Sequence, residues 1–259
     1  MSKIKKFRII NYKNIEPNLK VKNISKSIDG KKIIQNLNLS INPGSINGLL
    51  GPNGSGKTTL FNLILGIMKP DRGEIYAKEK NKGEKINLLP VHERASRFRI
   101  GYIPQNESIF RGISCVDNLK AIAQIAIKDK REQNETVDRL LAEFTLQDVR
   151  NILAQNLSGG QKKKLVIARA LINKPRILLM DEIFAAVDPI TIENIKKIIV
   201  NLQVNKNISI LITDHAFDNV LQISDKIFII SDGQIVSSGK PQDIIRDENA
   251  RQVYFGETY

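Results

Sequence analysis

The chain has 259 residues, of which 41% are hydrophobic and 26% charged, a composition typical of one or two folded domains. The single cysteine, Cys115, excludes an internal disulfide, and with only two histidines it also excludes a zinc site built from these residue types. No apolar run approaches the ~18 residues of a membrane span. The basic start lacks the apolar core of a secretory signal, so we expect a cytoplasmic protein.

The net charge is +13, from 40 Lys and Arg against 27 Asp and Glu. Such an excess suits polyanionic neighbours, including nucleic acid, nucleotides and lipid headgroups. The basic residues are scattered along most of the chain, however, and a solvated surface explains them equally well. Charge alone therefore does not identify a partner.

Hydrophobic patterning predicts strands that alternate with helices, which favours an α/β core with parallel strands. Residues 1–18 form a basic extension, residues 19–259 the folded domain, and residues 78–85 a charged loop. The all-helical stretch from about 106 to 160 is expected to be an insertion into the core. Strands are predicted at 19–24, 33–41, 45–50, 74–77, 100–103, 177–181, 208–213, 226–230 and 234–236. Helices are predicted at 57–68, 116–127, 131–144, 146–153, 159–172, 189–204 and 216–223, with a short helical piece at the end.

A phosphate-binding loop follows the third predicted strand and precedes the first predicted helix. Its sequence GPNGSGKTT fits the pattern G-x-x-x-x-G-K-[ST]. In such a loop the glycines let backbone N–H groups face the phosphates, Lys57 reaches the β- and γ-oxygens, and the Thr58 hydroxyl binds Mg²⁺. The helix N-terminus adds a favourable dipole. The residues expected to contact the nucleotide here are Gly51, Pro52, Asn53, Gly54, Ser55, Gly56, Lys57, Thr58 and Thr59.

Two further segments carry chemistry. The apolar strand Ile177-Leu-Leu-Met ends in Asp181 and Glu182, at the edge of an α/β sheet where ligands bind. Asp181 suits a Mg²⁺ shell, and Glu182 is placed to accept a proton from an attacking water. The second segment, Leu157 to Gln161, reads LSGGQ and opens a predicted helix, so its backbone N–H groups form another anion cradle.

These three segments, in this order, resemble those of the ATPase subunits of ABC transporters over roughly residues 19–259. The resemblance implies an α/β fold: a P-loop NTPase core with an antiparallel β-subdomain and a helical insertion. It implies ATP hydrolysis, with ATP and Mg²⁺ as cofactors. It also implies a homodimer in which each ATP lies between the phosphate loop of one subunit and Ser158, Gly159, Gly160 and Gln161 of the other.

Other residues gain a role only from this resemblance. Gln105, in Tyr-Ile-Pro-Gln, corresponds to the glutamine that senses the γ-phosphate and Mg²⁺, and Asp188 resembles the loop that crosses the dimer interface. His215, in Leu-Ile-Thr-Asp-His, resembles the histidine that contacts the γ-phosphate. The implied catalytic residues are Glu182, His215 and Lys57, and the implied metal ligands are Thr58, Gln105 and Asp181. Two transmembrane permease subunits would dock near Gln105 to Arg111, which would place the chain on the cytoplasmic face of the inner membrane.

Within the family, the segments at 88–95, 108–111, 117–119 and 184–190 resemble the ATPase subunits of lipopolysaccharide exporters. The ATPase subunits of branched-chain amino-acid uptake transporters share much of this layout and are the alternative. A soluble ABC protein acting on nucleic acid or ribosomes is disfavoured because the chain has one cassette and no sustained heptads, so no nucleic-acid partner is expected. A non-hydrolysing cassette is disfavoured by the presence of the catalytic residues. Ile28 departs from the family, since it stands where an aromatic side chain usually stacks on adenine.

Overall fold

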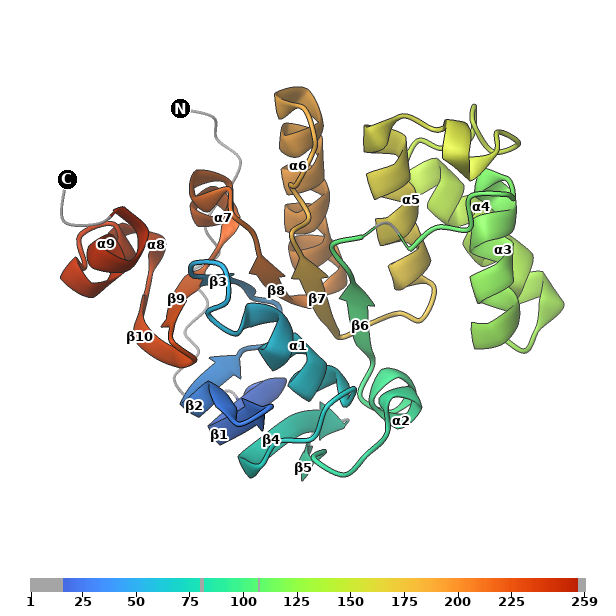
Figure 1. Ribbon diagram of the computed structural model, residues 1–259. Helices are drawn as coiled ribbons and strands as arrows, with labels where there is room; N and C mark the ends of the chain where they lie inside the picture. Colours follow the sequence, from blue (N-terminus) through green and yellow to red (C-terminus); the bar gives the residue numbers. More distant parts are fainter. Residues whose placement is uncertain (1–15, 80–81, 107, 256–259) are drawn as a thin grey trace.

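The computed structural model describes residues 16–79, 82–106 and 108–255, which form two β-sheets with helices between and around them (Figure 1). Of the predicted extension 1–18, all but residues 16–18 lies outside the described part. The first sheet is antiparallel, with the strand order β2-β1-β4-β5. Its strands are β1 (Leu19–Ile28), β2 (Lys31–Ile41), β4 (Arg72–Glu79) and β5 (Lys82–Lys85).

The second sheet has the strand order β10-β9-β3-β8-β7-β6. All neighbouring strands pair in parallel except β10, which runs antiparallel to β9. The carboxyl ends of the parallel strands therefore meet at one edge, where ligands bind in sheets of this kind. The strands are β3 (Ile46–Leu50), β6 (Ile100–Ile103), β7 (Ile177–Asp181), β8 (Ser209–Thr213), β9 (Lys226–Ser231) and β10 (Gln234–Gly239).

Helix α1 (Lys57–Leu65) packs between the two sheets (Figure 1). The central strand β7 shows how the core divides, because successive side chains of a strand point to opposite faces. Leu179 belongs to the buried cluster that includes Phe61 of α1, whereas Leu178 and Met180 belong to the cluster formed with the other helices. Both faces of the central strands are thus covered, as parallel sheets require. The predicted α/β fold class is confirmed.

Apart from α2 (Val91–Ser96), which packs against α1 and β6, the remaining helices cover the other face of the six-stranded sheet or extend from it. Helices α3, α4 and α5 pack together, and Figure 1 shows α3 and α4 to one side of that sheet. Among the described residues, no helix has both the length and the apolar character of a membrane span. These helices are α3 (Cys115–Ala126), α4 (Lys130–Glu143), α5 (Gly159–Leu171), α6 (Pro189–Lys206), α7 (Phe217–Ile223), α8 (Pro241–Ile244) and α9 (Glu248–Phe255).

Two local predictions are wrong. Residues 78–85, predicted as a loop, instead extend β4 to Glu79 and form β5; β5 is a hydrophilic edge strand without an apolar pattern. Residues 146–153, predicted as a helix, form turns, because backbone carbonyls of this segment bond to the start of α3 instead of to a helix of their own. The Cys115 N–H, for example, donates to the Ile152 carbonyl at 2.9 Å. The sequence pattern does not predict helix α2. This helix has only six residues, and its one buried side chain is an arginine, so it has no apolar periodicity.

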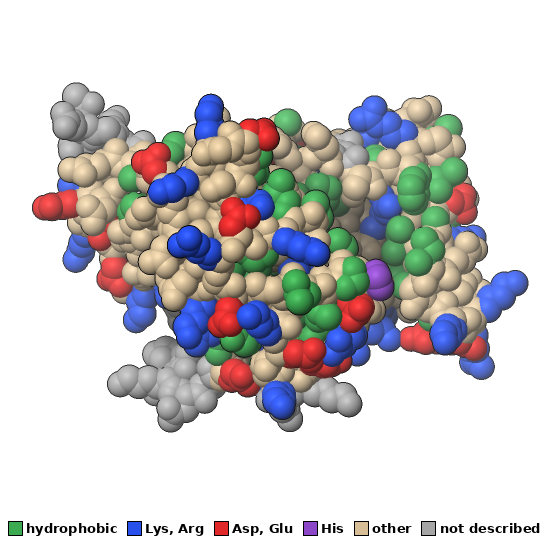
Figure 2. Space-filling view, turned by 60° about the horizontal axis from the view of Figure 1, so that its bottom comes forward, with side chains coloured by type: hydrophobic (Ala, Val, Ile, Leu, Met, Phe, Trp, Pro, Cys, Tyr) green, Lys and Arg blue, Asp and Glu red, His purple; other side chains and the backbone are tan. Residues whose placement is uncertain are grey.

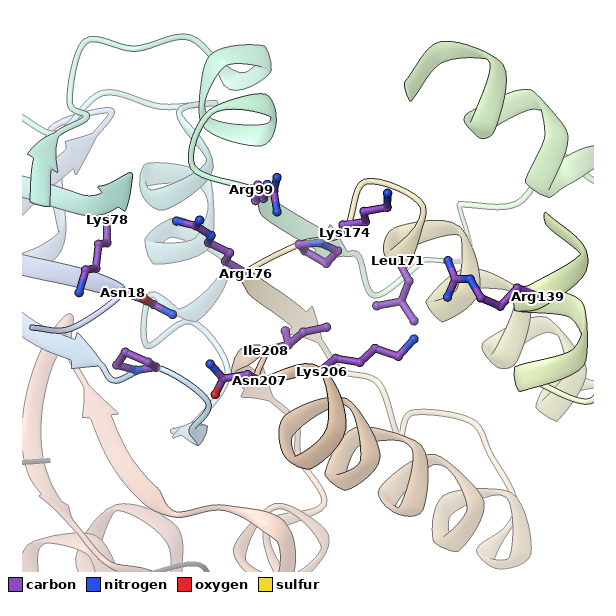
Figure 3. A pocket seen from close by; sticks show the side chains of 12 residues that line it. Asn18, Lys78, Arg99, Arg139, Leu171, Lys174, Arg176, Lys206, Asn207 and Ile208 are labelled. Carbon is purple, nitrogen blue, oxygen red and sulfur yellow. The ribbon is translucent and has the colours of Figure 1, made fainter. Parts of the chain in front are cut away.

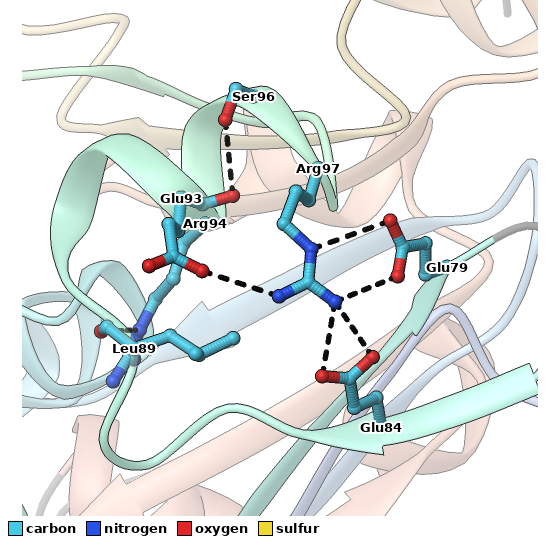
Figure 4. Close-up of polar contacts among 7 residues, drawn as sticks. All are labelled: Glu79, Glu84, Leu89, Glu93, Arg94, Ser96 and Arg97. Carbon is cyan, nitrogen blue, oxygen red and sulfur yellow. Dashed lines mark hydrogen bonds and ion pairs between the residues drawn. The ribbon is translucent and has the colours of Figure 1, made fainter.

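Two arginines, Arg94 and Arg97, connect α2 to α1 and to strands β4 and β5 (Figure 4). Arg97 pairs with carboxylates of β4, β5 and α2, and its guanidinium lies 2.9 Å from both Glu79 and Glu84. Arg94 is 1% exposed and donates to the last carbonyls of α1, at 2.7 Å from Leu63 O and 2.9 Å from Ile64 O. Burial lowers the pKa of Arg94 to about 10. The guanidinium thus caps a helix C-terminus, where cations are favoured.

Charge of both signs is spread over the face seen in Figure 2, where Lys and Arg side chains alternate with Asp and Glu. Basic and acidic residues are therefore intermixed on this face, as they are along the sequence. It does not form the single-sign patch that is typical of a nucleic-acid interface.

Candidate active site

The phosphate-binding loop connects β3 to α1 at the carboxyl edge of the six-stranded sheet. Its conformation needs glycine: Gly54 and Gly56 have φ angles of 78° and 104°, which other residues adopt only with strain. A Cβ on Gly56 would lie 3.0 Å from the Ile33 carbonyl, and one on Gly51 would lie 2.1 Å from the Ile230 carbonyl. Glycine at these two positions therefore lets the loop pack closely against the segments that contain Ile33 and Ile230.

The N-terminus of α1 suits an anion. Neither a side-chain cap nor an acidic residue occupies its first turn, so its N–H groups and dipole are available to phosphate. The Lys57 ammonium lies against the loop and donates to the carbonyls of Gly51 at 2.7 Å and Pro52 at 2.8 Å. Burial lowers its pKa, while the carboxylates of Glu182 and Asp181 raise it. Among the described residues, the buried Ser55 hydroxyl has no hydrogen-bond partner.

Asp181 ends β7 as a buried carboxylate surrounded by hydroxyl groups. Its Oδ2 lies 3.4 Å from both the Thr58 and the Tyr102 hydroxyls, and Thr213 donates to Oδ1. Burial, together with Asp181, raises the pKa of Tyr102 to about 12. No cluster of three or more His, Cys, Asp or Glu side chains suited to a metal occurs in the described residues. The oxygen-rich surroundings of Asp181 and Thr58 fit Mg²⁺, which protein sites usually hold with one or two carboxylates plus substrate phosphates.

Three residues that are far apart in the sequence meet beside Asp181. Gln105 Nε2 donates to Glu182 Oε2 at 2.5 Å, and His215 Nε2 lies 3.1 Å from Glu182 Oε1. The Glu182 backbone has a φ angle of 48°, and its N–H donates to the Thr213 carbonyl at 2.8 Å. The Glu182 side chain is 17% exposed and that of His215 is 48% exposed. A carboxylate held at both oxygens yet open to solvent can accept a proton from a bound water.

The structure also reveals a residue to which the sequence assigned no role. Asp214 is buried, and its two carboxylate oxygens accept the N–H groups of Phe184 at 2.7 Å and Ala216 at 2.9 Å. It therefore joins the segment after Glu182 to the segment after His215. Burial raises its pKa, and these two backbone hydrogen bonds oppose that shift. The available signal was its position at the end of an apolar strand, next to His215.

The segment LSGGQ lies at the N-terminus of α5. The Ser158 hydroxyl accepts the Gln161 N–H at 3.3 Å, and Gln161 Oε1 accepts the Ser158 N–H at 2.9 Å, which is a capping box. Asp188 caps α6 in a similar way, and its hydrogen bonds with Thr191 lower its pKa. A Cβ on Gly160 would lie 3.0 Å from the Thr191 hydroxyl, so the two helix starts are neighbours.

Comparisons with known proteins agree with this geometry. A family model described as "ABC transporter" matches residues 34–185. The lipopolysaccharide export system ATP-binding protein LptB of Haemophilus influenzae is 41% identical over 243 residues, which are 93% of this chain and 98% of that protein. LptB of Escherichia coli K12 is also 41% identical, over 242 residues and the same shares of the two chains.

Solved structures agree as well. An ATP-binding cassette of an ABC transporter in its ADP conformation superposes with a TM-score of 0.80 at 29% identity, covering 93% of this chain and all of that one. A dimeric cassette in a post-hydrolysis state bound to ADP and Pi has a TM-score of 0.74 at 27% identity, covering 86% of this chain and 98% of that one. On its loop geometry, its sheet topology and these similarities, the chain belongs to the ABC transporter family, as a nucleotide-binding subunit that hydrolyses ATP.

Proposed function

We propose that this chain drives lipopolysaccharide export by hydrolysing ATP as a homodimer beneath two transmembrane subunits. The observation that carries the catalytic part is the contact of Gln105, Glu182 and His215 beside the phosphate loop. The transport assignment is supported by 41% identity to LptB over nearly the full length of both proteins. The chain would act at the cytoplasmic face of the inner membrane.

In the proposed mechanism the phosphate loop and the α1 N-terminus bind the triphosphate, and Lys57 moves from its loop carbonyls to the β- and γ-oxygens. Glu182 takes a proton from the water that attacks the γ-phosphorus in line. His215 and Lys57 stabilise the charge that develops on the transferring phosphoryl group. Thr58, Asp181 and Gln105 are the residues that would hold Mg²⁺, which neutralises phosphate charge when bound.

The second half of each site would come from the partner subunit. Ser158 and Gly159 are exposed at the start of α5, and α5 offers its N-terminal dipole to the γ-phosphate bound by the other copy. Asp188, exposed at the start of α6 next to α5, would lie in the same interface. The dimeric arrangement of a solved relative supports this assignment. ATP would close the dimer, and product release would reopen it.

The transmembrane subunits would dock beside Gln105, on the segment that ends at Arg111. Phe110 is 48% exposed, and the Arg169 guanidinium stacks 4.6 Å from its ring centre. Its backbone is held by Asn118, which accepts the Phe110 N–H at 2.8 Å and donates to its carbonyl at 2.9 Å. An exposed aromatic side chain on a fixed backbone is a typical interface anchor.

Affinity purification of the tagged chain from membranes, with identification of the transmembrane subunits that co-elute, tests this proposal. Two transmembrane subunits and co-purifying lipopolysaccharide are the expected result. Addition of lipopolysaccharide to the reconstituted complex should change its ATPase rate. Co-elution with amino-acid permeases would refute the transport assignment and leave the ATPase assignment standing. Co-purification with ribosomes or nucleic acid would refute both membrane docking and export.

A further inference from the structure

A cavity lies at the edge of the six-stranded sheet opposite the phosphate loop (Figure 3). It has a volume of about 520 Å³ and is lined where β6, β7 and β8 begin and where α5 and α6 end. Because β7 has five residues, at roughly 3.3 Å each, the cavity is separated from Asp181 by about the length of that strand. It is therefore distinct from the nucleotide site. Its volume is within the range of pockets that bind small molecules.

The cavity is strongly basic. Its lining includes no Asp or Glu among the described residues. Figure 3 shows the cationic side chains spaced along the cavity, on separate helices, strands and connecting segments. They are Lys78, Arg99, Arg139, Lys174, Arg176 and Lys206.

Nearby carboxylates explain the positions of four of these cationic side chains. Glu143 forms ion pairs with Lys206 at 2.8 Å and with Arg139 at 3.6 Å. Lys174 forms an ion pair with Glu132 at 2.9 Å. Lys78 lies 3.8 Å from Glu16. Lys206 also belongs to the last turn of α6, where the helix dipole favours a cation. These side chains would be placed as they are without any ligand.

Arg99, which is exposed, and Arg176, which is half-buried, are not paired in this way. Within the described residues, neither side chain makes an ion pair or a hydrogen bond that would balance its charge. The two lie on adjacent strand starts, since the Arg176 N–H donates to the Arg99 carbonyl at 2.9 Å. Both side chains line the cavity, and an anion bound there would offset their two positive charges.

We propose that this cavity binds a small anion that carries two or more phosphate groups. Arginine recognises phosphate through paired N–H donors. Two guanidinium groups without carboxylate partners, beside four further cations that already pair with carboxylates, suit a multiply charged ligand. The concave shape favours a compact molecule over an extended polyanion or a flat membrane surface. Asn18 and Asn207 supply uncharged polar groups in the same lining.

Calorimetric titration with inorganic tripolyphosphate in Mg²⁺-free buffer tests the proposal. Because the phosphate loop also binds such anions, the titration is made on Lys57→Ala as well as on the wild-type chain. Two classes of site are expected for the wild type and one for Lys57→Ala. In the Lys57→Ala background, Arg99→Gln with Arg176→Gln should weaken the remaining binding tenfold or more.

Arg246→Gln is the matched control, since Arg246 is exposed beyond α8 at the opposite side of the sheet, where α8 packs on β9 and β10. It should leave the affinity unchanged, and Arg176→Lys, which keeps the charge but loses the paired N–H donors, should weaken binding less than Arg176→Gln does. If the double variant does not fold, the same titration is made on Arg99→Gln alone. Arg99 is exposed, so replacing it should not disturb the fold.

Three results would overturn the proposal. The first is no binding to Lys57→Ala at millimolar tripolyphosphate, and the second is equal weakening by Arg246→Gln, which would indicate general charge attraction only. The third is sedimentation with anionic phospholipid vesicles that depends on Arg99 and Arg176 while tripolyphosphate does not bind. That outcome would assign the cations to a membrane surface instead.

Discussion

Replacing Glu182 with glutamine tests the central assignment of the site. In the structure one carboxylate oxygen accepts Gln105 at 2.5 Å and the other lies 3.1 Å from His215. A glutamine amide can preserve both contacts, by accepting from Gln105 and donating to an unprotonated His215 nitrogen, but it cannot accept a proton. Hydrolysis should therefore fall by about 10²–10⁴-fold, which corresponds to about 3–5 kcal/mol of activation free energy.

Nucleotide binding should survive this change, because one negative charge near the phosphates is removed while Lys57 and the α1 N-terminus remain. ATP would then persist between two copies and hold the dimer closed. Size-exclusion chromatography with ATP and Mg²⁺ should show a dimer for Glu182→Gln, whereas Lys57→Ala, which weakens phosphate binding, should stay monomeric. A wild-type rate of phosphate release from Glu182→Gln would refute the assignment of Glu182 as the base.

Four other changes have defined outcomes. Phe110→Ala should reduce co-purification of the transmembrane subunits while the isolated chain keeps its melting temperature; unfolding with intact docking would mean that Phe110 only fills the core. Arg94→Met should lower the free energy of unfolding in urea by at least about 3 kcal/mol, because it leaves buried carbonyls of α1 unpaired, and the surface variant Arg97→Met should cost clearly less. Because burial raises the pKa of Asp214, its charged form is disfavoured in the folded state. The stability of the wild type relative to Asp214→Asn should therefore increase as pH falls from 7 through the raised pKa towards the ordinary value near 4, and a flat difference would contradict this. Ile28→Tyr should tighten ATP binding several-fold, since base stacking contributes roughly 1–3 kcal/mol; equal affinities in fluorescence titration would show that stacking is not what the site lacks.

Much of the architecture could be predicted because it depends on short-range patterns. The phosphate loop is specified by consecutive residues, and the apolar run before Asp181 predicts a buried central strand from its composition alone. Short-range patterns do not predict β5, because Glu84 and its neighbours show no apolar alternation. This strand is stabilised by pairing with β4 and by the ion pair of Glu84 with Arg97. Short-range patterns also fail at 146–153, where backbone groups find partners on α3.

The fold class, the phosphate loop and the residue types available for hydrolysis can all be recognised in the amino-acid sequence, because each depends on a contiguous segment. Which of these residues contact one another depends on how distant segments pack. Gln105 and His215 lie 77 and 33 residues from Glu182 along the chain, and they converge because parallel strands bring their carboxyl ends to one edge of the sheet. The partners of Asp214, the carbonyls around Arg94 and the basic cavity at the opposite edge likewise come from distant segments. Hydrogen bonds and charge pairs act over a few ångströms in space, and that proximity has no counterpart in the spacing of the residues along the chain.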